Sequence, residues 1–186
     1  VAYIHAVGDQ DIEELLSRDG SLHELLRAKK RGLARFVGFT AHNRTGYAKR
    51  ILNECSDLDV VMFAMNFVER NVYGFEDEVL PIAVEQNLGI AAMKVYGGAA
   101  AMEYHQPVVS AMTARGNLDH HLAFRYALSL PGVALNVIGV YTPEELEQNI
   151  EWAQSFVPLS ADERQQLEVI GRAAAETWGE RYGVVE

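Results

Sequence analysis

The side chains best suited to chemistry in this sequence lie in or directly after short apolar segments. His5 stands within VAYIHAV, Thr40 ends ARFVGFT, and Lys94 ends GIAAMK. Near pH 7 a neutral imidazole can orient or polarise a carbonyl, and a lysine that ends an apolar segment can contact an anion. A histidine satisfied in the core and a lysine that reaches solvent are the alternatives. His42 and Asn43 follow Thr40 directly, but these residue types are also common in loops.

The segment from Gly132 to Ile150 is a second candidate, because an apolar run there leads directly into a capped helix. Thr142 supplies an N-cap oxygen, Pro143 suits the first helical position, and Glu145 completes a capping box. Free N–H groups and a partial positive charge at such a helix start are typical of phosphate sites. An ordinary connection between a strand and a helix has the same residues, so the pattern alone leaves both interpretations open.

Composition argues against several classes of partner. The sequence has 26 acidic and 16 basic residues, a net charge of −10, which disfavours binding to nucleic acid or to an anionic membrane. No apolar run reaches the roughly 20 residues that span a bilayer. The one cysteine, Cys55, cannot form an internal disulfide, and the histidines show no metal-ligand spacing. These features predict a cytoplasmic protein without a metal site.

Five segments have the pattern of strands, and a helix is expected after each of them. The strands are expected over 1–7, 34–40, 59–65, 89–94 and 133–138. The helices are expected over 21–32, 45–54, 75–86 with Pro81 in the first turn or at a bend, 118–130, from 143 onward, and over 160–178. Strands that alternate with helices predict consecutive right-handed units around a parallel sheet.

The number of these units predicts a partial (β/α)8 barrel. A closed eight-stranded barrel takes about 250 residues, whereas this chain has 186. Because the chain begins at Val1 inside a strand, we expect residues 1–186 to be the C-terminal portion of a single barrel domain. A missing N-terminal part or another copy of the chain would then cover the open sheet edges. A doubly wound five-stranded sheet is the alternative, although no strand precedes a Gly-x-Gly-x-x-Gly turn.

Five segments together resemble the aldo-keto reductase family in their order and spacing. They are VAYIHAV, RFVGFTAHN, DVVMFAMN, LGIAAMKVYGGAA and AFRYALSLPGVALNVIGVYTPEELEQNI. The resemblance covers nearly the whole chain and implies strand four to the C-terminus of that family's TIM barrel. It also implies reduction of aldehydes or ketones to alcohols with a nicotinamide cofactor, usually NADPH, by a tetrad of Asp, Tyr, Lys and His.

The resemblance assigns one member of this tetrad to the chain. His5 matches the histidine, whose role would be to orient the carbonyl of a small-molecule substrate. The tyrosine, lysine and aspartate precede strand four in the family and have no counterparts in these 186 residues. Carbonyl reduction is therefore expected only together with a segment that supplies them.

The same resemblance implies a cofactor site with two parts. At the nicotinamide, Thr40 matches a residue that holds the carboxamide, Met62 replaces a glutamine, Met93 replaces a stacking aromatic residue, and Lys94 and Gly97 belong to a Met-Lys-x-x-Gly-Gly branch. At the adenosine end the matching residues are Val140, Tyr141, Thr142, Glu145, Gln148 and Asn149. The resemblance implies NADP as the cofactor. NADPH-specific members carry Lys and Arg where this chain has Gly139 and Glu145, a change that should weaken the contact to the 2′-phosphate, so NAD is the alternative.

Two classes of function follow from these features. The first is an NAD(P)H-dependent oxidoreductase of which this chain carries most of the cofactor site. The second is a noncatalytic nucleotide-sensing or interaction module on the same fold, because a fold alone does not fix an activity. An upstream sequence with the Asp, Tyr and Lys would favour the enzyme, and one without the tyrosine would favour the module.

Overall fold

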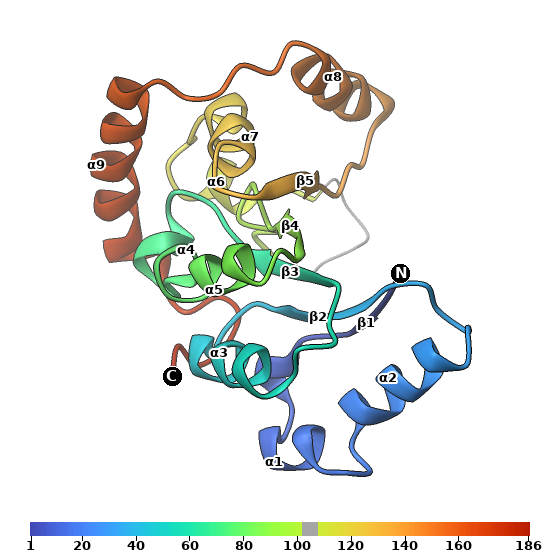
Figure 1. Ribbon diagram of the computed structural model, residues 1–186. Helices are drawn as coiled ribbons and strands as arrows, with labels where there is room; N and C mark the ends of the chain where they lie inside the picture. Colours follow the sequence, from blue (N-terminus) through green and yellow to red (C-terminus); the bar gives the residue numbers. More distant parts are fainter. Residues whose placement is uncertain (102–107) are drawn as a thin grey trace.

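A computed structural model of the protein describes residues 1–101 and 108–186 and shows one parallel sheet (Figure 1). The five strands lie side by side in sequence order, and each neighbouring pair is parallel. An unbroken order has no switch point of the kind that defines a doubly wound sheet. The structure therefore confirms the predicted partial barrel. The strands are β1 Ala2–Ile4, β2 Val37–Ala41, β3 Val60–Ala64, β4 Gly89–Met93 and β5 Val133–Val137.

Helices connect the strands and complete the chain after β5. In Figure 1, α9 stands along one side of the molecule, and α8 lies on the other side, beyond β5. Among the helices that the structure describes, none is both long enough and apolar enough to cross a membrane. The helices are α1 Ile12–Leu16, α2 Ser21–Lys30, α3 Thr45–Glu54, α4 Phe75–Glu78, α5 Leu80–Glu85, α6 Ala111–Ala114, α7 His120–Leu128, α8 Pro143–Gln154 and α9 Ala161–Trp178, with 3-10 helices η1 Val7–Asp9 and η2 Glu69–Asn71.

Several predicted element boundaries are confirmed, because local capping chemistry sets them. The helix predicted over 45–54 is α3, and α9 begins with the capping box of Ser160 and Glu163. Helix α8 begins at Pro143, directly after Thr142, whose hydroxyl accepts from the Glu145 amide at 3.2 Å. The helix predicted over 75–86 is split into α4 and α5, and its proline lies at the start of α5.

Other local predictions were wrong. Strand β1 ends at Ile4 and does not continue to residue 7, because Ala6 adopts a left-handed conformation with φ 51°. The helix predicted over 21–32 starts at Ser21 as expected but ends at Lys30, and its N-cap is Gly20. Residues 9–20, for which no helix was expected, contain α1, and the Asp11 side chain caps its N-terminus.

One face of the sheet packs against helices and forms the core. Phe39 of β2 and Phe63 of β3 have ring centroids 5.8 Å apart, and Phe63 stacks on Phe75 of α4 at 5.1 Å. All three are buried. Because side chains alternate along a strand, the residues between these positions point to the opposite, inner face of the sheet.

The inner face is covered at the middle of the sheet and open at its last strand. The register places Thr40, Met62, Ala91 and Leu135 in one row across β2 to β5. Thr40 and Ala91 are buried, whereas Leu135 is 49% exposed and Val137 is 41% exposed. An apolar inner face therefore ends at an uncovered edge strand.

Candidate functional site

The carboxyl ends of the parallel strands meet at one edge of the sheet, which we call the carboxyl rim. His5 follows β1 there and His42 follows β2, and their imidazole rings lie 5.8 Å apart, edge to face. Ile4 packs into the helix-covered core, whereas His5 is exposed, so His5 belongs to the inner side of the strand. The Ala6 amide donates to the Thr40 hydroxyl at 2.8 Å. The structure thus brings His5, Thr40 and His42 together.

Asn66 and Lys94 link the ends of β3 and β4. Lys94 follows β4 in a left-handed conformation with φ 57°, and its carbonyl accepts from the Asn66 side-chain amide at 2.9 Å. The Asn66 side-chain oxygen accepts from the Val68 and Glu69 amides, each at 2.9 Å. Asn66 is fully buried and its side chain is hydrogen-bonded on both sides. Its role is to hold the rim together, and the Lys94 side chain is left for other contacts.

Met62 and Met93 lie on the inner face next to the rim. Met62 pairs in register with Thr40, and Met93 pairs with Ala64 and Val137. Met93 is 7% exposed and Met62 is half-buried. Thioethers offer polarisable surface and only a weak acceptor, so a ring bound beside them would be held by contact rather than by hydrogen bonds.

Trp178, at the end of α9, joins the rim from the far end of the chain. Its indole N–H donates to the buried Glu69 carboxyl at 2.6 Å. A Cβ built on Gly97, which has φ 75°, would lie 2.6 Å from the Trp178 ring. The predicted site residue Gly97 therefore serves a left-handed turn and the close packing of Trp178.

The C-terminal segment 179–186 continues from Trp178 across the rim. The Tyr182 carbonyl accepts from the Asn43 side chain at 2.5 Å, and the Tyr182 amide donates to the Tyr73 hydroxyl at 2.8 Å. The Tyr182 ring lies 5.7 Å from the His42 ring. The sequence analysis missed this contribution, because Asn43 and Tyr182 are 139 positions apart and no local pattern connects them.

Two titratable groups at the rim have strongly shifted pKa values. Burial, the positive charge of Lys94 and the nearby His5 lower the pKa of His42 to about 4, so its ring is neutral at pH 7. Burial raises the pKa of Glu69 to about 7, against the opposing effects of the Trp178 hydrogen bond and the Arg181 charge. Shifts of this size are typical of functional sites but also occur in structural clusters.

The start of α8 is the second predicted binding region, and its own carboxylate occupies part of it. The Tyr141 amide donates to the Glu145 carboxylate at 2.7 Å, while the Glu145 amide donates to Thr142. Val140 and Tyr141 are 38% and 49% exposed. The helix start is therefore accessible, but a phosphate there would have to displace or approach a like charge.

Gln148 and Asn149, the residues predicted at adenine, make contacts within the chain. The Gln148 amide donates to Glu151 at 3.1 Å, and the Asn149 amide donates to the Glu145 carbonyl at 2.8 Å. The Tyr96 hydroxyl donates to the Asn149 side-chain oxygen. This last hydrogen bond joins α8 to the loop after β4 and so connects the two predicted parts of the site.

Within residues 1–101 and 108–186, no group of three or more His, Cys, Asp or Glu side chains could hold a metal ion.

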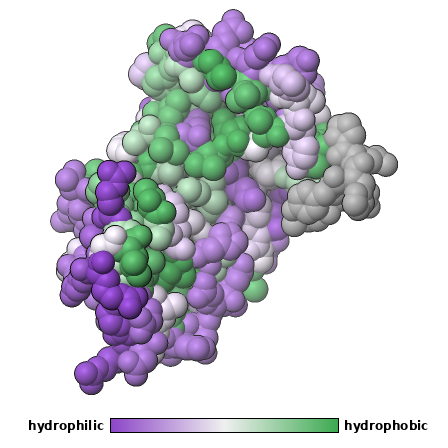
Figure 2. All heavy atoms as spheres, turned by 90° about the vertical axis from the view of Figure 1, so that its right-hand side faces the viewer, coloured by the Kyte–Doolittle hydropathy of each residue, from purple (hydrophilic) through white to green (hydrophobic). Residues whose placement is uncertain are grey.

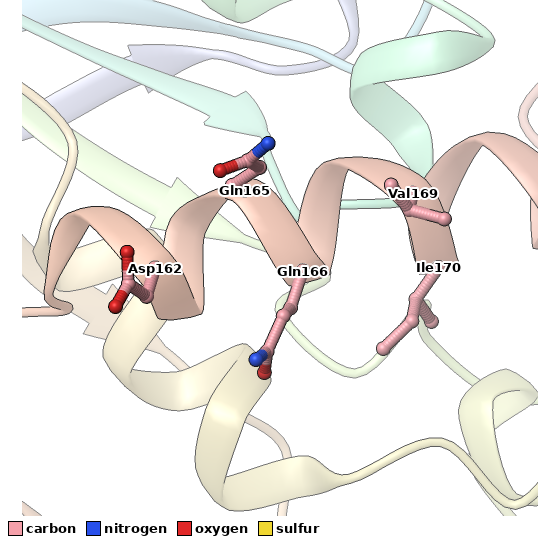
Figure 3. A pocket seen from close by; sticks show the side chains of 5 residues that line it. All are labelled: Asp162, Gln165, Gln166, Val169 and Ile170. Atoms are coloured by element: carbon pink, nitrogen blue, oxygen red, sulfur yellow. The ribbon is translucent and has the colours of Figure 1, made fainter.

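A hollow of about 590 Å3 lies along α9, away from the rim (Figure 3). Its lining residues all come from that helix and none belongs to the rim: Asp162, Gln165, Gln166, Val169 and Ile170.

A comparison with models of protein families shows to which family this chain belongs. A family model described as the aldo/keto reductase family matches residues 1–172. The chain belongs to the aldo-keto reductase family. Among solved structures, aldo-keto reductase AKR11C1 from Bacillus halodurans in its apo form is similar at 17% sequence identity and a TM-score of 0.64. The match covers 97% of this chain and 63% of that protein.

Two further aldo-keto reductase structures show the same relation. One from Klebsiella pneumoniae, in complex with NADP and acetate, matches at 19% identity and a TM-score of 0.63, covering 91% of this chain and 58% of its own. Aldose reductase from Giardia lamblia matches at 17% sequence identity and a TM-score of 0.57, and the match covers 80% of this chain and 48% of that protein. At such identities the likeness shows the fold, and this chain spans less than two thirds of each protein. A comparison with curated protein sequences gives no match.

The buried Glu69 makes stability depend on pH. Its folded pKa of about 7 exceeds the ordinary 4.5, so the native state binds the extra proton between these values. The stabilisation is complete below pH 4.5 and is lost as the pH rises through 7, by about 3 kcal/mol in total. Urea unfolding from pH 4.5 to 8 should show this loss. Glu69→Gln, which keeps an acceptor for Trp178, should flatten the profile.

Glu147→Gln on the exposed side of α8 is the matched control and should leave the slope unchanged. Glu76, whose pKa burial raises to about 8, contributes a further slope of the same sign to all three proteins. An unchanged slope in Glu69→Gln would show that Glu69 does not titrate in this range.

Proposed function

We propose that this chain is the cofactor-binding part of an NAD(P)H-dependent oxidoreductase that reduces aldehydes or ketones to alcohols. The observation that carries the proposal is the grouping of His5, Thr40 and His42 at the carboxyl rim of an aldo-keto reductase fold. Aldo-keto reductases that bind NADP and NADPH are similar to it in structure. In a barrel of parallel strands this rim is where active sites lie.

In this mechanism His5 binds the substrate carbonyl oxygen through an imidazole N–H and orients it. His5 is exposed on the inner side of β1, so a small molecule can reach it. His42 lies beside His5 and its ring is neutral, so it places no second positive charge near Lys94. The proton that completes the alcohol comes from a tyrosine outside these 186 residues, which the family's lysine and aspartate assist.

The residues at the rim fit a nicotinamide cofactor, which supplies a hydride when bound. Thr40 offers a hydroxyl at the rim, and Met62 and Met93 offer the adjacent apolar row. Lys94 supplies a positive charge for a phosphate. At the adenosine end we assign Val140 to Thr142 at the start of α8, with Gln148 and Asn149 further along that helix.

Replacement of His5 tests the function in the full-length protein. His5→Gln should leave the Kd for NADPH within about threefold, while kcat/KM for a simple aldehyde falls about 100-fold, because only the bound carbonyl loses its donor. NADPH binding by fluorescence and NADPH oxidation by absorbance give the two values. NADPH binding without aldehyde reduction in the unaltered protein would favour the nucleotide-sensing module, and absence of binding would reject both functions.

The acidic start of α8 predicts weak discrimination between NADP and NAD. The Glu145 carboxylate lies at the Tyr141 amide, and no lysine or arginine stands at position 139 or 145. Glu145→Arg should therefore tighten NADPH binding about tenfold and leave NADH binding almost unchanged. Glu147→Arg, on the same helix, is the control for general charge. A strong NADPH preference that Glu145→Ala does not alter would show that the 2′-phosphate binds elsewhere.

We propose further that the open inner face at β5 is covered by the remaining strands of the barrel. Leu135 and Val137 expose apolar side chains there, and Leu146 and Ile150 of α8 are each 47% exposed. Figure 2, which views the molecule from the right-hand side of Figure 1, shows apolar residues gathered broadly on this face. Parallel sheets occur almost only with both faces covered.

A charged side chain at the inner face tests this cover. In the full-length protein Leu135→Lys should lower the free energy of unfolding by about 3 kcal/mol, because an unpaired ammonium would be buried. Val169→Lys on α9, where the valine is 68% exposed, should stay within about 0.5 kcal/mol. Equally small losses of the free energy of unfolding in the two variants would mean that the inner face is not covered. If it is covered, the molar mass from light scattering distinguishes a monomer from a pair of chains.

A further inference from the structure

Tyr96 connects the loop after β4 to helix α8, although it lies 53 positions before its partner in the chain. The Tyr96 hydroxyl donates to the Asn149 side-chain oxygen, and the Asn149 side-chain nitrogen donates to the Glu145 carbonyl at 2.8 Å. A backbone carbonyl can only accept, so the amide nitrogen must face Glu145. The amide oxygen therefore faces Tyr96, and the orientation of the Asn149 side chain is fixed at both ends.

The Tyr96 ring is held in turn by the start of α7. The His120 ring contacts it edge to face, with the two ring centroids 4.7 Å apart. His120 Nε2 lies 2.7 Å from the hydroxyl oxygen of Ser110, which caps α6 by accepting from the Thr113 amide at 3.1 Å. Burial raises the pKa of the Tyr96 hydroxyl, so the phenol stays protonated at neutral pH. Tyr96 is therefore a donor whose position is set by its neighbours.

The hydrogen bond from Tyr96 leaves the Asn149 oxygen able to accept once more. A carboxamide oxygen has two lone pairs, and Tyr96 uses one of them. Asn149 is half-buried at the side of α8, so a ligand can reach the second lone pair. This position requires a donor. Adenine has an amino group at its six-position, whereas hypoxanthine has an oxygen there that can only accept.

We infer that Tyr96 is a positioning residue that presents the Asn149 oxygen to the amino group of adenine. The inference rests on the proposed function, which assigns Asn149 to the adenosine end of the cofactor. It adds that the choice of base at α8 depends on a side chain from the loop after β4. Loss of the Tyr96 hydroxyl would free the Asn149 amide to rotate, and the preference for a donor on the base would fall.

The test is a double-mutant cycle on cofactor binding by the full-length protein, followed by fluorescence. The ligands are NADPH or NADH, whichever binds more tightly, and the same dinucleotide with hypoxanthine in place of adenine. The unaltered protein should prefer the adenine form at least about tenfold, and Tyr96→Phe should reduce this preference to about threefold or less. Asn149→Ala should remove the preference. Tyr96→Phe added to Asn149→Ala should change neither Kd, because the two residues act together.

Tyr47→Phe, at a half-buried tyrosine of α3, is the matched control and should leave both Kd values unchanged. Equal weakening of both ligands by Tyr96→Phe would indicate a loosened loop and would overturn the inference. The same effect of Tyr96→Phe with and without Asn149 would also overturn it, as would an unaltered protein that does not distinguish the two bases. These results would leave the proposed function in place. Absence of NADPH and NADH binding in the unaltered protein would reject the proposed function and the inference together.

Discussion

The hydrogen bond between the Trp178 indole and the buried Glu69 carboxyl is the contact on which the rim depends. It fixes the end of α9 against the loop after β3, at 2.6 Å and out of solvent. Trp178 then packs over Gly97, and the following residues bring Tyr182 to His42. A buried carboxyl costs free energy unless it is hydrogen-bonded or protonated, and its raised pKa reflects this cost. The site is therefore assembled by tertiary contacts from the far end of the chain.

Charge is distributed unevenly over the two parts of the site. The rim carries Lys94 and the neutral His42, whereas the start of α8 carries the Glu145 carboxylate and no basic residue. The Tyr96 to Asn149 hydrogen bond joins these two regions. An anionic ligand would be attracted at the rim end and would gain little at the helix end. The site therefore differs from one in which basic side chains bind a phosphate at both ends.

One face of the sheet is covered by helices along its length, whereas the inner face is open at its last strand. Phe39, Phe63 and Phe75 form a packed core against the helices, while Leu135 and Val137 expose the inner face at β5. Exposed apolar surface costs about 25 cal/mol per Å2 relative to burial, and typical domains are stable by only 5 to 15 kcal/mol. The stability of the fold is thus tied to whatever covers this face.

The sequence by itself determined the parallel order of five strand and helix units, the family, and those boundaries that local caps set, such as Ser160 at α9 and Thr142 at α8. Hydrophobic periodicity and capping are local, so they can be read from neighbouring residues. Only the tertiary structure decided that Asn66 is structural, that Gly97 makes room for Trp178, and that Tyr182 lies between His42 and Lys94. These contacts join residues far apart in the chain, and their geometry depends on the packing of the whole sheet.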